Sequence, residues 1–150
     1  MCQVNKKCIF NNKKGCISLS VCYTSCTMGL DQYAKKVKRE YNHETLTETI
    51  TKTEISYWRK HNALEGWMAN LWRSRGMDGE FNCQVVQLTK ENLDNLENDV
   101  KKGVLPQTEG FFFGGDTSQD EDCKAQDLEF IAKARKCLDN GFDVEYTSWW

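Results

Sequence analysis

The 150-residue sequence has few of the residues and motifs that make most functional sites recognisable. It contains two His and one Pro, and its apolar runs fall well short of the roughly 20 residues that span a membrane. It has no GxxxxGK[ST] or GxGxxG loop, no HExxH, no GxSxG and no CxxC. The sequence therefore lacks the motif of a phosphate-binding loop, and two His in total argue against a His-based metal site. Any catalysis would therefore rest on carboxylates, on Arg or Lys, or on Cys.

The composition predicts one soluble globular domain. Hydrophobic residues make up 39% and charged residues 28% of the chain. A formal net charge of -2 gives no electrostatic case for a nucleic acid polymer or an anionic membrane as partner. The Cys residues after position 27 are scattered, which is typical of reduced thiols in a cytoplasm. We therefore expect a cytoplasmic protein.

The first 27 residues differ from the rest. They hold four Lys, no Asp or Glu, and five of the eight Cys, so all 22 acidic residues lie further along the chain. We interpret residues 1–27 as a non-native or disordered extension, with natural initiation at Met28. A secretory signal and a disulfide or metal knot are the alternatives. Residues 28–150 are then a single α+β domain.

Residue periodicity gives the order of elements. Period-two alternation and β-branched residues predict strands, and apolar spacings of three and four predict helices. The predicted strands are residues 30–41, 44–54, 83–89, 111–113 and 142–150. The predicted helices are residues 54–76, 89–103 and about 118–140. The fold class is α+β, with a single small mixed sheet of about four to five strands and about three helices.

The predicted boundaries have local reasons. Thr53 or Ser56 would cap the first helix, and Gly76 would end it. For the second helix, acids come early, Lys comes late, and Gly103 is the stop. "SQDE" at 118–121 has the form of a capping box for the third helix.

The first predicted helix carries the strongest candidate site. At helical spacing one polar stripe would contain Glu54, Trp58, Asn62 and Glu65, flanked by Arg59 and Lys60. Carboxylates, an indole, an amide and two cations on one face can hold a polar ligand by hydrogen bonds and stacking. The structural alternative is a solvated face with helix ion pairs and Trp58 packed at the edge of the core.

Two further segments are candidates. In "GFFFGGDTSQDED" (110–122), Gly114 and Gly115 allow close backbone approach, and a helix N-terminus that receives an anion would follow. The acids from Asp116 onward suit a divalent cation at least as well, or only cap the helix. At the chain end, Trp149 and Trp150 point to opposite sides of one strand, so one of them is expected to meet a partner or a ligand.

Several motifs, in order, resemble a family of small bacteriophage and bacterial proteins of unknown function. The family pattern runs MGLDMYL, YWRKxNAIHxWF, an isolated Cys, LPTxxGFFFG and a final SW. This chain has "MGLDQY" (28–33), "YWRKHNALEGWM" (57–68), Cys83, "LPQTEGFFFGG" (105–115) and "YTSWW" (146–150). It carries Glu65 where the family often has His. Some members bear the label phosphoglycerate kinase, but 150 residues are too few for the two domains of such an enzyme.

The resemblance implies a phage-type accessory protein in the host cytoplasm. We expect the first helix, the triple-Phe segment and the chain end to enclose one cleft that binds a small polar ligand, such as a nucleotide or nucleotide signal, without catalysis. The predicted ligand-binding residues are Glu54, Trp58, Arg59, Lys60, Asn62, Phe112, Gly114 and Trp149. No cofactor and no metal site are predicted, and a homo-oligomer stays open.

Two alternatives belong to other classes. One is a small metal-assisted phosphotransferase or hydrolase that uses Glu54, Glu65 or Asp116. The other is a protein–protein interaction module that acts through Trp149 and Trp150.

Overall fold

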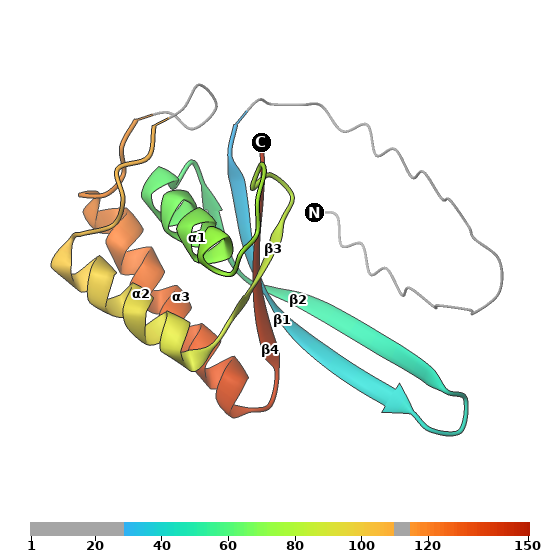
Figure 1. Cartoon of the computed structure of the whole chain (residues 1–150). Coiled ribbons are helices and arrows are strands. Elements are labelled where there is room, and N and C mark those ends of the chain that lie inside the picture. The colour runs from blue at the N-terminus through green and yellow to red at the C-terminus, as the bar shows by residue number, and fades with distance from the viewer. Residues whose placement is uncertain (1–28, 110–114) are drawn as a thin grey trace.

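The computed structural model describes residues 29–109 and 115–150. Figure 1 shows three helices on one side of a four-stranded sheet, so the α+β class predicted from the sequence is confirmed. The elements follow in the order β1 (Asp31–Asn42), β2 (Thr47–Arg59), α1 (Asn62–Ser74), β3 (Val85–Leu88), α2 (Lys90–Lys102), α3 (Glu121–Asp139) and β4 (Asp143–Trp149).

The sheet has the strand order β2-β1-β4-β3, and all three pairings are antiparallel. The sequence predicted a mixed sheet, and this part of the prediction is wrong. β1 and β2 form a hairpin, and β4 returns from α3 to lie antiparallel between β1 and β3. Because every pairing between described strands is antiparallel, none of them needs the crossover connection that joins parallel strands.

The core lies between the sheet and the helices. Trp58 of β2 is 2% exposed and meets Phe130 of α3 edge-on, with 4.9 Å between ring centroids. Tyr146 of β4 is fully buried beside it. The aliphatic part of the core comes from α1 and α2 as well as the sheet, and includes Leu64, Met68, Leu93, Leu96, Val86 and Val144. Three helices and one sheet face therefore share a single hydrophobic core.

The predicted helix 54–76 is wrong in its first third. β2 continues to Arg59, which is paired with Asp31 of β1, and α1 begins only at Asn62. Lys60 has a positive φ of 58° and turns the chain between the two elements. The N-cap residue is His61, so neither Thr53 nor Ser56 caps the helix. Pairing along all of β1 overrides the helical spacing of residues 54–60.

The other helix boundaries have clear chemical causes. Gly103 ends α2 in the left-handed conformation, as predicted. Thr89, where the predicted helix began, is the N-cap and forms a capping box with Asn92. α3 begins two residues later than the "SQDE" pattern predicted, because the N-cap is Asp120 and not Ser118. Asp120 accepts from the backbone N–H groups of Asp122 and Cys123. The predicted strand 111–113 lies outside the described residues.

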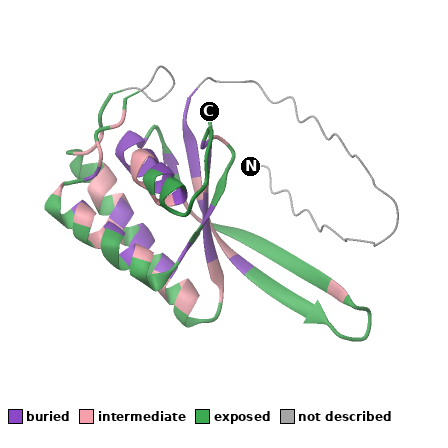
Figure 2. Cartoon of the chain, viewed as in Figure 1, coloured by how far each residue is buried: buried purple, intermediate pink, exposed green. Residues whose placement is uncertain are grey.

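The β1–β2 hairpin extends past the rest of the sheet. β4 pairs with β1 only as far as Val37, so residues 38–51, which we call the arm, form a two-stranded ribbon. Figure 2 shows that most of this ribbon is exposed, and Figure 1 shows it directed away from the helices.

Candidate functional site

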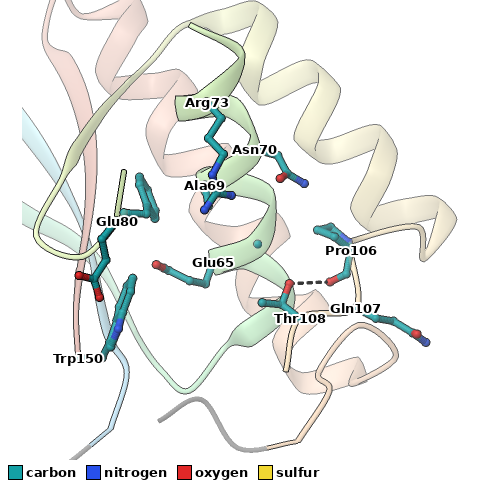
Figure 3. Close-up of a pocket in the computed structure, with 11 residues that line it drawn as sticks. Glu65, Ala69, Asn70, Arg73, Glu80, Pro106, Gln107, Thr108 and Trp150 are labelled. Atoms are coloured by element: carbon teal, nitrogen blue, oxygen red, sulfur yellow. Dashed lines mark hydrogen bonds between the residues drawn. The ribbon is translucent and has the colours of Figure 1, made fainter. Parts of the chain in front are cut away.

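A pocket of about 380 Å³ lies beside α1. Figure 3 shows its walls, which come from one face of α1, the segment 106–108, the segment 80–81 and the chain end. The volume is in the range of small-molecule sites. The lining side chains with chemistry to offer are Glu65, Asn70, Arg73, Glu80, Thr108 and Trp150.

Glu65 is the unusual group in this wall. Its side chain projects from α1 toward Glu80 and Trp150 (Figure 3), yet the residue is only 3% exposed. Its Oε2 accepts from the Tyr146 hydroxyl at 2.6 Å, and its Oε1 accepts from Ser148 Oγ at 2.8 Å. No cation in the described residues forms an ion pair with it. Burial raises the pKa of Glu65, and the two hydroxyl bonds oppose that shift.

Arg73 supplies the opposite charge at the other end of the pocket. It lies two helical turns beyond Glu65, with Ala69 and Asn70 between them on the pocket face of α1. The residue is exposed, and within the described parts of the chain its guanidinium has no ion-pair partner. The pocket therefore has a buried acceptor at one end and a cation at the other.

Gly66 brings the second wall close to the helix. A Cβ at this position would collide with Thr108 Oγ1 and lie 3.2 Å from Pro106 Cγ. Only a residue without a side chain lets residues 106–108 pack against α1 here. Gly66 is therefore the reason that the pocket has a wall on this side.

Trp150 closes a third side. Asn82 holds its backbone twice, because Asn82 Nδ2 donates to the Trp150 carbonyl at 2.9 Å and Asn82 Oδ1 accepts from the Trp150 N–H at 3.2 Å. The ring packs against the edge of the core and borders the pocket. A flat aromatic surface is thus fixed near the Glu65 carboxylate.

A chain of buried hydrogen bonds runs inward from Glu65. The Tyr146 hydroxyl also accepts from Gln32 Nε2 at 2.8 Å. Gln32 then bonds both backbone groups of His61, accepting from its N–H at 2.9 Å and donating to its carbonyl at 3.0 Å. His61 Nε2 lies 2.8 Å from Asp127 Oδ2. The start of α1 is therefore tied to β1, β4 and α3 by polar contacts inside the core.

Asp127, His61 and Thr117 line up in the order of an acid–base–hydroxyl triad, but their contacts indicate a structural role. Thr117 Oγ1 lies 2.9 Å from His61 Nδ1 and accepts from the Ala63 N–H at 3.2 Å. The hydroxyl therefore caps α1 in place of a side chain on the helix itself. Burial raises the pKa of Asp127, and the bond from His61 opposes that shift. The pocket beside Glu65 does not include these three residues.

The residues predicted from the sequence do not form one stripe. Glu54 is exposed on β2 opposite Lys35, and Trp58 is inside the core, where no ligand can stack on it. Arg59 pairs with Asp31 at 3.0 Å, and Lys60 is an exposed turn residue. Asn62 is fully buried and donates to the carbonyl of Gly115. The geometric reason is that β2 takes up the first part of the predicted helix.

The remaining predicted residues are Phe112, Gly114 and Trp149, and among the described residues none of them lines the pocket. Phe112 and Gly114 are outside the described residues. Trp149 is 48% exposed and does not line the pocket, whereas its neighbour Trp150 does. Because Tyr146 and Ser148 face the helices, Trp149 faces the opposite side of the sheet. The expected meeting of the helix with the chain end is present, but through Trp150.

The acids that precede α3 are used locally. Asp116 accepts from the Ser118 backbone and hydroxyl, which lower its pKa, and Asp120 caps the helix. Across residues 29–109 and 115–150, no group of three or more His, Cys, Asp or Glu side chains is arranged to hold a metal ion. In the same residues, no helix has the length and apolarity to cross a membrane.

The sequence analysis missed Arg73. It named Trp150 only as part of the chain-end candidate, and it named Glu65 as a member of a stripe that does not form and as a possible acid of the catalytic alternative. The spacing of Glu65, Ala69 and Arg73 was visible, but it needed the correct start of α1 to define a face. No family model, curated protein or solved structure matches this chain.

Proposed function

We propose that this protein binds a small polar ligand in the pocket beside α1, and that N–H groups of the ligand donate hydrogen bonds to the carboxylate of Glu65. The observation that carries this proposal is a carboxylate that is 3% exposed, borders a pocket and has no ion-pair partner in the described residues. A buried carboxylate needs donors or a cation. Tyr146 and Ser148 supply one donor to each oxygen, and each oxygen can accept at least one more.

The rest of the pocket limits the class of ligand. Trp150 offers a flat surface for a planar ring, and Arg73 offers a guanidinium for an anionic group. Glu80 adds a second negative charge to the same pocket, so Arg73 can balance a singly or doubly charged group better than a long polyphosphate. These features together favour a planar base linked to one phosphate.

Among planar bases, guanine presents two adjacent N–H donors on one edge, from a ring N–H and an exocyclic amino group. A carboxylate accepts such a pair in parallel, as it does from an arginine fork. Adenine presents a single amino donor beside an acceptor nitrogen, which would face Glu65 unfavourably. We therefore propose a guanine nucleoside monophosphate as the ligand type.

The proposed role is recognition without catalysis, by a phage-type accessory protein that acts in a host cytoplasm. Both oxygens of Glu65 are held by hydroxyl groups, which fixes the carboxylate for binding. The other titratable side chains of the pocket, Arg73 and Glu80, are exposed.

Isothermal titration calorimetry with guanosine and adenosine monophosphates tests this proposal on three forms of the full chain. The wild type and Glu80→Gln are expected to bind the guanine compound. Glu65→Gln, which replaces one acceptor by a donor, should bind it at least about tenfold more weakly, because one hydrogen bond to a charged group is lost. Glu80→Gln is the matched control, since it removes the same charge from an exposed position of the same pocket. Equal binding by wild type and Glu65→Gln would overturn the proposal, and so would the absence of binding to either nucleotide.

A further inference from the structure

β2 forms one edge of the sheet and is long for an edge strand. It has 13 residues, and in the described part of the chain it pairs with β1 on one side only. All seven residues from 48 to 54 are exposed. An edge of this length presents a row of backbone N–H and C=O groups that can template another strand.

The arm has little to stabilise it within one chain. Its residues lie beyond the last pairing with β4, so among residues 29–109 and 115–150 they form two strands without a third. Tyr41, Leu46 and Ile50 are 53%, 75% and 41% exposed. A two-stranded ribbon with both faces in water is marginally stable, and a third strand with packed side chains stabilises it.

We propose that a second copy of this chain pairs with β2 edge to edge, in an antiparallel register with a two-fold axis at Ile50. The side chains of β2 are complementary to themselves in this register. Ile50 lies opposite Ile50 of the other copy, and Glu48 lies opposite Lys52 in both directions. Thr49 then faces Thr51, and Thr47 faces Thr53. Apolar, opposite-charge and Thr–Thr pairs are the cross-strand pairs that stabilise sheets.

The neighbouring register does not have this complementarity. With the axis at Thr51, Glu48 would face Glu54, and Ile50 would face Lys52. Like charges directly opposite each other destabilise a sheet. The sequence of β2 therefore favours the register centred on Ile50 over the one centred on Thr51.

The ion pairs already present are compatible with the pairing. Lys52 Nζ lies 2.5 Å from Glu145 Oε2 of β4, so it extends over β1 and must leave this contact to meet Glu48 of the second copy. Arg39 Nη2, 3.6 Å from Glu145 Oε1, then remains as the cation beside Glu145. The side chain of Glu48 is 49% exposed, and its contact with Arg39 is long, at 3.9 Å, so Glu48 is available to the second copy. The resulting dimer joins two four-stranded sheets into one continuous sheet.

Charge reversal at the two complementary positions tests the register. Molar mass is measured by light scattering after size exclusion, over a range of concentrations, for wild type, Lys52→Glu, Glu48→Lys and a mixture of the two variants. Wild type is expected at twice the 17.4 kDa chain mass. Each variant alone places like charges opposite each other at two points and should dimerise at least about tenfold more weakly. The mixture restores opposite charges at both points and should recover the dimer.

Lys38→Glu is the matched control, because it reverses an exposed charge on the arm but on β1, away from the edge. It should leave the dimer unchanged. Circular dichroism confirms that each variant is folded. If either charge variant is unfolded, Ile50→Glu is used instead, since it places two carboxylates on the axis and should weaken the dimer similarly. A monomeric wild type, or a mixture no more dimeric than its components, would overturn the proposal.

Discussion

The hydroxyl of Tyr146 donates to Glu65 at 2.6 Å and accepts from Gln32 at 2.8 Å. This one group joins the pocket to the buried polar chain that fixes the start of α1. The carboxylate is thus held from inside the core rather than from the surface. Such an arrangement sets the position of Glu65 in the wall of the pocket.

Glu65→Gln is expected to stabilise the fold at neutral pH. The amide can still accept from one hydroxyl and donate to the other, and it removes a buried charge with no ion-pair partner in the described chain. We expect a gain of about 1 kcal/mol, or roughly 2–4 °C in Tm. Thermal unfolding by circular dichroism measures it. A lower Tm for the variant at pH 7 would show that the ionised carboxylate is itself stabilising.

The same variant has a predictable pH dependence. Because the pKa of Glu65 is raised above its ordinary value of 4.5, the folded state holds this proton more tightly than the unfolded state. The stability that comes from the proton is present below the unfolded pKa and is lost as pH rises through the folded pKa. The advantage of Glu65→Gln should therefore grow as pH rises and vanish in acid. Asp127, whose pKa is also raised, contributes to the pH dependence of folding stability in both the wild type and the variant.

Tyr146→Phe is expected to destabilise the fold by about 1–3 kcal/mol. The ring still fills the core, but Glu65 loses a donor and the Gln32 amide loses an acceptor. Urea unfolding measures the change. Tyr41→Phe is the control, because Tyr41 is 53% exposed and its variant should unfold with the wild-type midpoint. Equal midpoints for the two variants would contradict the buried hydrogen-bond chain.

Trp58→Ala and Arg59→Ala separate packing from ligand binding at the residues that the sequence pattern favoured. Trp58 is in the core against Phe130, so its removal should cost about 3–5 kcal/mol. Arg59 makes an ion pair near the surface, and its variant should keep a midpoint close to that of wild type. Urea unfolding again measures both. A mild effect of Trp58→Ala would place this indole outside the core.

Gly66→Ala tests the close approach of residues 106–108 to α1. In an open helix this change would stabilise by about 1 kcal/mol through helix propensity. Here the new methyl collides with Thr108, so we expect lower stability and weaker ligand binding. In a Thr108→Gly background the same change should become neutral or stabilising. A stabilising effect in the wild-type background would mean that no such contact shapes the pocket.

The sequence predicted those features that depend on neighbouring residues. The start of the second helix at Thr89 and its stop at Gly103 depend on local chemistry, and both are confirmed within one residue. The start of α1 was missed because residues 54–59 satisfy a helical spacing, while their pairing partners lie in β1. Glu65 could not be recognised as a pocket residue from its neighbours alone. The hydroxyls that hold it come from β4, more than 80 positions away.

The most direct test is a carbon-13 NMR titration of the Glu65 side-chain carboxyl, assigned by its absence in Glu65→Gln. Ligand N–H donors stabilise the ionised form, so saturating guanosine monophosphate should lower the pKa of Glu65. Adenosine monophosphate at the same concentration should leave the pKa of Glu65 unchanged. A titration midpoint that the guanine nucleotide does not move would contradict the proposed recognition by this carboxylate.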